Sequence, residues 1–153
     1  HCLGGGLGLL LSCDLAYARR GVRIGTPELD VGLFPMMIAP LILRSAPRSK
    51  ALEMIYTAAM LSADDAAALG LVTRALDPDG FEEAVESTLA SIAAKAPVAL
   101  AAGRQALSRV KDLELEPALH HLCDQLAALV QTEDAREGLA AFLQKRKPVW
   151  KGR

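Results

Sequence analysis

The order of its hydrophobic patterns most constrains what this chain can fold into: short extended segments come first, and helical patterns fill the rest. Two short runs near the start, Leu15–Ala18 and Val22–Gly25, are typical of strands joined by a polar turn. From Phe81 onward the spacing of apolar residues predicts successive helices over Phe81–Lys95, Val98–Val110 and Glu116–Val130. Aromatic residues make up only 4% of the chain while Ala and Leu dominate, which also favours helix. This one-sided order indicates the end of an α/β domain whose other strands lie upstream.

Glycine and apolar spacing predict the segments between the strands and the later helices. The run Gly4–Gly6 predicts a tight turn that feeds a helix with apolar residues on all sides, which we expect to be buried all round. We expect a loop over Leu29–Pro35 and a helix over Met36–Arg44. A further helix is predicted over Arg48–Met60, with an apolar face formed by Leu52, Ile55, Tyr56 and Met60.

Capping residues set the ends of two more helices. Ser62 and Asp65 have the spacing of a capping box, and Gly70 is suited to the turn that ends the helix they open. Thr132 is expected to cap the last helix of the chain.

Length and charge narrow the functional class. A chain of 153 residues can form one domain with a sizeable core, and its net charge of −1 gives no overall attraction to nucleic acid or to a membrane surface. No apolar run reaches the roughly 18 residues of a membrane span. Three cysteines without paired spacing favour a reducing, cytoplasmic location over a disulfide framework. His120 and Cys123 alone are a weak metal signal, so we predict no metal site.

Two groups could carry chemistry. The backbone N–H groups of Gly4–Gly6, at the start of a helix, could hold an anion or a developing oxyanion; a packed turn that needs small residues is the structural alternative. Glu28 follows a strand and precedes apolar residues, and a carboxylate with apolar neighbours suits general acid/base work. A glutamate on a surface loop is the alternative reading of Glu28.

These groups come together in a resemblance to the crotonase (enoyl-CoA hydratase/isomerase) family. Four motifs match the family's pattern in order and at familiar spacing over nearly the whole chain: Gly4–Ala18, Ile24–Pro35, Leu61–Val72 and Thr132–Pro148. Together with an apolar start that has no initiator Met, the match makes us expect the C-terminal part of a longer protein. The resemblance implies an α/β fold with part of a ββα spiral core over residues 1–76 and a helical trimerisation region over residues 77–153.

The resemblance also implies an enzyme of fatty acid metabolism that acts on acyl-CoA thioesters, as a homotrimer or a dimer of trimers and without a further cofactor. Gly5 would give one backbone N–H to the thioester carbonyl, and a segment upstream of His1 would give the other. Glu28 would be the catalytic acid/base. The substrate-binding positions implied are Gly4, Gly8, Phe34, Pro35, Phe142 and Lys145, the last two on the final helix near a neighbour's coenzyme A. Lys145 lies in a basic cluster at the end of the chain. The resemblance implies that this cluster contacts phosphate; the alternative is a solvated helix end.

Two departures from the family pattern bear on the reaction. Hydratases of the family carry a first glutamate two residues after the glycine run, where this chain has Gly8. A single carboxylate suffices to move a double bond, so Gly8 favours isomerisation or related enolate chemistry over hydration. A Gly-rich stretch is also replaced by Met36–Pro40, a bulkier apolar surface that could reshape the acyl pocket.

Two rival expectations accompany this interpretation. The protein could be a non-catalytic acyl-CoA-binding or assembly subunit, because Gly8 removes one carboxylate. The 153-residue piece by itself is expected to be inactive, and exposed sheet edges could prevent it from folding alone.

Overall fold

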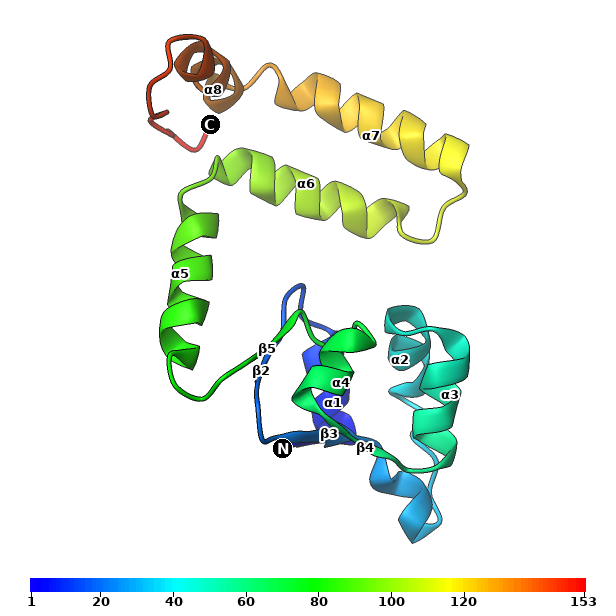
Figure 1. Ribbon diagram of the computed structural model, residues 1–153. Coiled ribbons are helices and arrows are strands. Elements are labelled where there is room, and N and C mark those ends of the chain that lie inside the picture. The colour runs from blue at the N-terminus through cyan, green and yellow to red at the C-terminus, as the bar shows by residue number, and fades with distance from the viewer. The chain divides into compact units, whose positions relative to one another are not determined.

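The computed structural model describes residues 1–153 and divides into two compact units, His1–Val85 and Glu86–Arg153 (Figure 1). The first holds all five short strands, and the second consists of helices followed by a C-terminal tail. The division between spiral core and trimerisation region at residues 76 and 77 stays a prediction.

Two small sheets organise the first unit. In one, β1 (Cys2–Leu3) runs parallel to β3 (Arg23–Gly25), which is antiparallel to β4 (Met60–Ser62). In the other, β2 (Tyr17–Arg19) pairs in parallel with β5 (Arg74–Leu76). The predicted early strands are therefore present, each within two residues of the expected bounds.

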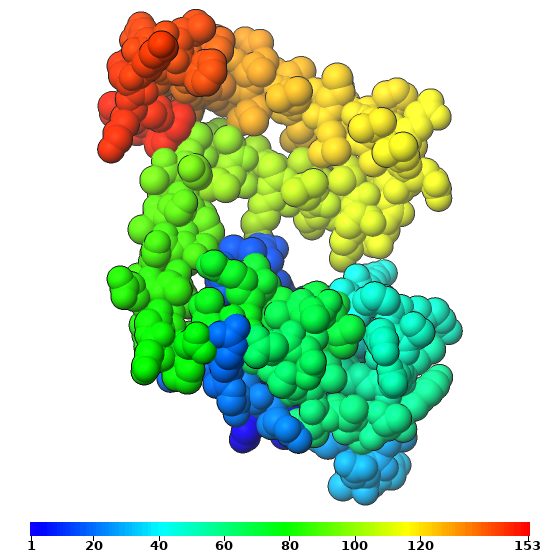
Figure 2. All heavy atoms as spheres, in the orientation of Figure 1, coloured from blue at the N-terminus to red at the C-terminus, as the bar shows by residue number.

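Helices cover these sheets and enclose the core. They are α1 (Gly5–Leu11), the 3₁₀ helix η1 (Pro27–Val31), α2 (Ala39–Ser45), α3 (Arg48–Tyr56) and α4 (Ala63–Ala68). The core side chains come from α1 to α4, from the strands and from the segments between them, but not from η1. They include Leu7, Ile24, Ile42, Met54, Ile55 and Leu71. In Figure 2 the blue, cyan and green atoms of this unit pack closely around that core.

The expectation that α1 is buried all round was wrong. Leu7 is fully buried, but Leu9 is 76% exposed. Successive helical residues are 100° apart, so these two side chains leave α1 in opposite directions, and only the side of Leu7 meets the core. Apolar composition identified the helix but did not show which side faces a partner.

The helix predicted over Arg48–Met60 ends earlier, at Tyr56. Ala58 has a φ of 50°, and the N–H of Ala59 donates to the carbonyl of Met54 over 3.1 Å, which reverses the chain before β4 begins. Met60 therefore lies in a strand, and Tyr56 is 63% exposed. The buried face of α3 consists of Ala51, Met54 and Ile55.

The capping predictions for α4 were confirmed. The side chain of Ser62 accepts the N–H of Asp65, and the carboxylate of Asp65 accepts the N–H of Ser62. Gly70 follows the helix at a φ of 81°, and the N–H of Leu71 donates to the carbonyl of Ala66. This places Leu71 and Val72 on the core side, before the chain leads into β5.

The second unit is helical. Its elements are the end of α5 (Phe81–Ala93), α6 (Pro97–Val110), α7 (Leu115–Leu129) and α8 (Glu133–Leu143). Helices α6 and α7 lie side by side (Figure 1). Thr132 caps α8 as predicted, through its side chain and the N–H of Ala135. No single helix is long and apolar enough to cross a membrane; α5 and α6 reach that length only as a pair bent by 99°.

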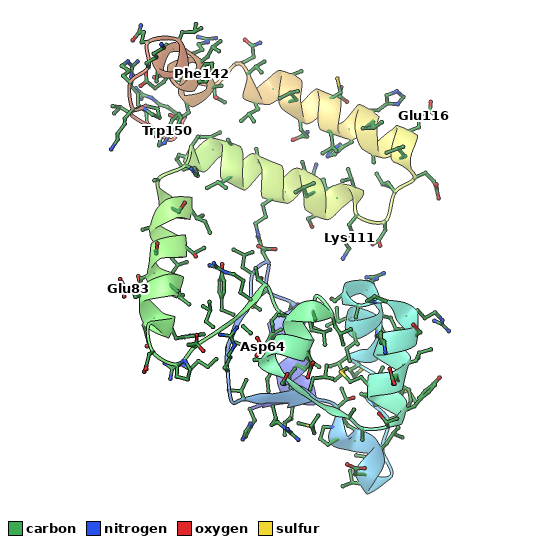
Figure 3. All side chains as sticks on the ribbon, in the orientation of Figure 1. Asp64, Glu83, Lys111, Glu116, Phe142 and Trp150 are labelled. Carbon is green, nitrogen blue, oxygen red and sulfur yellow. The ribbon has the colours of Figure 1, made fainter.

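The tail after α8, residues 146–153, is here named the C-terminal strap, and it folds back onto that helix. Arg146 pairs with Glu137, and the indole N–H of Trp150 donates to the carbonyl of Ala94 over 2.9 Å. Figure 3 shows Trp150 beside the start of α6. The carboxylate of Asp134, only 2% exposed, accepts the N–H groups of Lys151 and Gly152.

Candidate active site

The glycine run begins where β1 ends. The N–H of Gly4 donates to the carbonyl of Gly25 over 3.0 Å, which continues the pairing of β1 with β3 by one residue. Gly4 has a φ of 51° and a ψ of −124°, a conformation that residues with a Cβ avoid. The run therefore contains both a turn that needs glycine and the start of a helix, as the sequence predicted.

Glu28 lies against this turn. It is the second residue of η1, which follows β3, and Pro27 sets the start of that short helix. A Cβ atom at Gly4 would lie 3.0 Å from Oε1 of Glu28 and 3.6 Å from Cδ. Two segments 24 positions apart in the chain thus place a carboxylate against the glycine turn.

The carboxylate of Glu28 is only partly engaged. Its Oε2 atom is buried and accepts no hydrogen bond. A buried carboxylate oxygen without a donor is unfavourable unless a ligand, a water molecule or a proton supplies the contact. The fold itself supplies no hydrogen-bond donor to this oxygen.

Backbone donors lie beside Glu28. At the start of α1 the carbonyl of Gly4 accepts the N–H groups of Leu7 and Gly8, whereas Gly5 and Gly6 donate no such hydrogen bond. Gly5 is exposed, and no atom outside its immediate neighbours lies within 4 Å of the place a Cβ would take. The N–H of Gly5 is thus free to bind a ligand oxygen.

Gly8 is the buried counterpart of Gly4 one helical turn later. A Cβ atom at Gly8 would lie 2.5 Å from Cγ2 of Ile38, a distance that real Cβ atoms do not adopt. Ile38 is 7% exposed and belongs to the core. Gly8 is therefore required by packing, and a ligand could reach it only through displacement of Ile38.

The predicted acyl-pocket residues differ in exposure. Pro35 is buried, and its carbonyl accepts the N–H groups of Ile38 and Ala39 before α2. Phe34 is 37% exposed. Between them and α2 lie the exposed side chains of Met36 and Met37, so an apolar surface continues from Phe34.

Phe142 and Lys145 lie in the second unit. Phe142, labelled in Figure 3, is on α8 and is 79% exposed. The prediction that Lys145 is on the final helix was wrong, because α8 ends at Leu143. Lys145 has a φ of 52°, and the N–H of Arg146 donates to the carbonyl of Ala141, which closes the helix before Lys145 is reached.

Sequence reasoning missed two residues of this region. Thr26 is fully buried, and its Oγ1 atom makes no hydrogen bond, two positions before Glu28. Ile38 was not singled out, because an apolar residue in an apolar run carries no separate signal. A cavity of about 430 Å³ lies instead at the far end of α1, near Leu11, Asp14 and Thr73, and is lined by none of the candidate residues. No group of three or more His, Cys, Asp or Glu side chains could hold a metal ion.

Comparison with curated proteins gives relatives along the whole chain. It is 34% identical to 2,3-dehydroadipyl-CoA hydratase of Escherichia coli, over 100% of this chain and 60% of that protein. It is 31% identical to short-chain-enoyl-CoA hydratase of Clostridium acetobutylicum, over 95% of this chain and 56% of that protein. The chain thus spans about 60% of the length of the curated relatives it matches.

Solved structures agree with the sequence matches. An enoyl-CoA hydratase of Mycobacterium smegmatis superposes with a TM-score of 0.94 at 34% identity, over 97% of this chain and 58% of that one. An enoyl-CoA hydratase of Geobacillus kaustophilus gives 0.93 at 32% identity, over 100% of this chain and 59% of that one. These matches confirm the predicted crotonase-like α/β fold. The Enoyl-CoA hydratase/isomerase family matches residues 1–153, and the chain belongs to that family.

Proposed function

We propose that the protein, at its full natural length, is an acyl-CoA-processing enzyme of enoyl-CoA hydratase/isomerase type with Glu28 as its acid/base. The observation that carries this proposal is the position of the Glu28 carboxylate against Gly4, with one oxygen buried and without a hydrogen bond. A carboxylate held by the fold but not satisfied by it is suited to exchange a proton with a bound substrate. Membership in the family supplies the substrate class.

In this proposal the backbone of α1 handles the developing charge. Removal of a proton next to a thioester carbonyl places negative charge on the carbonyl oxygen, and N–H groups aimed at that oxygen stabilise it. Gly5 supplies one such group, which makes no other hydrogen bond. The second donor is expected from a segment outside residues 1–153.

The other residues assigned to the site bind the substrate. Phe34 and Pro35 line the acyl chain, and Gly4 gives the backbone at the start of α1 the close approach that a bound thioester needs. Gly8, the other glycine assigned to substrate binding, is covered by Ile38 and would contact the thioester only where that side chain moves aside. Phe142 and Lys145 contact coenzyme A, with the ammonium group of Lys145 near phosphate. Coenzyme A enters as part of the substrate, so the reaction requires no further cofactor.

Assembly and location complete the proposal. On α8 the side chains of Leu139, Phe142 and Leu143 are 63%, 79% and 73% exposed, which supports burial against other subunits in a homotrimer or dimer of trimers. The free thiols of Cys2, Cys13 and Cys123 support a cytoplasmic location, where thiols stay reduced.

The test is an assay of the full-length protein with 2-enoyl-CoA and 3-enoyl-CoA substrates of short and medium chain length. Glu28→Gln keeps the shape of the side chain and removes its acid/base function, so turnover should fall by about 10²–10⁴-fold. Asp30→Asn is the matched control, because Asp30 is an exposed carboxylate on the same 3₁₀ helix. Unchanged turnover in Glu28→Gln contradicts the assigned role. Tight acyl-CoA binding without turnover by the unaltered protein would instead identify an acyl-CoA-binding subunit.

A further inference from the structure

We infer that Ile38 determines which reaction this site can carry out, because its side chain occupies the space that any side chain at position 8 would need. The inference rests on the proposed function, since it assigns the neighbour of the acid/base Glu28. Ile38 was not indicated by composition or by any motif, and it is the side chain that packs against Gly8.

The geometry places Glu28 and Ile38 against two glycines that are four positions apart. Gly4 and Gly8 are one helical turn apart, since the carbonyl of Gly4 accepts the N–H of Gly8 over 3.4 Å. Residues four apart share one face of a helix and are separated by about 6 Å along its axis. Glu28 lies against the first of these glycines and Ile38 against the second. The carboxylate thus lies against the residue that precedes α1, and the apolar side chain lies against Gly8, one helical turn further along the chain.

The position of Ile38 is fixed by the backbone on both sides. Its N–H donates to the carbonyl of Pro35 over 3.2 Å, and its carbonyl accepts the N–H of Ile42 over 3.1 Å at the start of α2. The contact with Gly8 involves the γ2 methyl group, which branches directly from Cβ and has few alternative positions. Ile38 therefore cannot make room for a larger residue at position 8 by moving only the end of its side chain.

This arrangement limits the chemistry. Hydration of a 2-enoyl thioester adds the hydroxyl of water to C3 and a proton to C2, so a water molecule must be held and deprotonated in the site. A water molecule in a protein interior needs two to four polar partners, and Ile38 offers none. Double-bond migration needs only one base, which removes a proton from C2 and returns it to C4 while the double bond moves from C3–C4 to C2–C3. Glu28 can perform both of those proton transfers.

The experiment combines changes at the two positions in the full-length protein. Ile38→Ala removes the γ2 methyl group and leaves a Cβ atom 3.6 Å from the Cβ position of residue 8, an ordinary van der Waals distance. Ile38→Val is the matched control, because valine keeps a methyl group at the γ2 position. Gly8→Glu is then introduced into the unaltered protein and into both variants, and hydration of 2-enoyl-CoA is compared with migration of the double bond in 3-enoyl-CoA.

We expect the ratio of hydration to migration to rise at least about tenfold in Gly8→Glu with Ile38→Ala, since a positioned carboxylate contributes about 10²–10⁴-fold. With Ile38→Val, Gly8→Glu should lower the melting temperature and give no such rise. An equal rise in both backgrounds, or none in a folded Ile38→Ala variant, overturns the inference. Loss of all turnover on Glu28→Gln in each background keeps the proposed function intact in either case.

A second measurement does not depend on turnover. Gly8→Ala should lower the melting temperature of the unaltered protein and of Ile38→Val, and leave that of Ile38→Ala unchanged or raised. This decides the question if the glutamate variants do not fold. An equal loss in all three backgrounds shows that the methyl group of Ile38 does not restrict position 8.

Discussion

Asp134 gives the sharpest prediction about how the second unit is held together. Its carboxylate is 2% exposed and accepts the N–H of Lys151 over 2.7 Å and that of Gly152 over 3.1 Å. Its own N–H, in the first turn of α8, donates to the carbonyl of Arg153 over 3.0 Å. The carboxylate of Asp134 is therefore the buried contact between the C-terminal strap and the start of α8, beside the exposed ion pairs of Glu133 with Lys151 and Arg153. Its removal should loosen the strap.

The magnitude follows from the two bonds that are lost. A hydrogen bond to a charged group contributes about 1.5–3 kcal/mol. The N–H groups of Lys151 and Gly152 can turn to water when the strap opens, so the lower end applies to each bond. Asp134→Ala should therefore destabilise the closed strap by about 3 kcal/mol, which corresponds to roughly a hundredfold change in its opening equilibrium.

Native-state hydrogen exchange in the full-length protein measures this opening. In Asp134→Ala the amides of Lys151 and Gly152 should exchange about a hundredfold faster, and Asp134→Asn, which keeps one acceptor oxygen, should lie in between. Asp124→Ala is the control, because Asp124 is exposed on α7. If the two amides keep their protection in Asp134→Ala, the strap is held by its other contacts and the reasoning fails.

Three further predictions concern the turn, a cap and a carboxylate. Gly4→Ala should lower the free energy of unfolding by about 1–2 kcal/mol, because Gly4 has a φ of 51°; thermal unfolding measures this loss. The added Cβ would also press on Glu28, so turnover in the enoyl-CoA assay should fall. Ser62→Ala removes the capping box of α4 and should lower the free energy of unfolding in urea by about 1 kcal/mol; no change would mean that water replaces the cap. The pKa of Glu137 is lowered to about 2, chiefly by the hydrogen bond from Arg146, so its ionised form stabilises the fold above its ordinary pKa of 4.5 and this contribution is lost as the pH falls toward 2. Unfolding curves at decreasing pH should show a larger loss for the unaltered protein than for Glu137→Gln, and parallel losses would contradict the assignment.

Helix ends show how far the sequence could predict the fold. The end of α4 was predictable because Gly70 adopts the left-handed conformation that glycine favours. Helices α3 and α8 end with the same hydrogen-bond pattern, but Ala58 and Lys145 occupy the left-handed position there. Neither residue type signals such a turn. The end of α3 was predicted four residues too late, and Lys145 was wrongly placed on α8. No residue near either helix end signalled the correct position.

Some features of the candidate site could likewise be predicted from the sequence, and others could not. The types and order of its residues identified Glu28 and the glycine turn, because a carboxylate after a strand and a glycine run are visible in one segment each. Contacts between distant segments were not visible. Gly8 could be read as the loss of a carboxylate, but its dependence on Ile38, thirty positions later, appears only when α1 and α2 are packed together.

The glycines near the site differ in what requires them, and that difference bears on how the reaction could change. Gly4 is required by its own backbone conformation as well as by Glu28, so no single change elsewhere would make a larger residue acceptable there. Gly8 lies in an ordinary helix and is required only by the methyl group of Ile38. A constraint of that kind is removed by changing its partner. Whether a second carboxylate can be accommodated at position 8 is thus set by two positions together, and Gly8→Glu should be tolerated only where Ile38 is also made smaller.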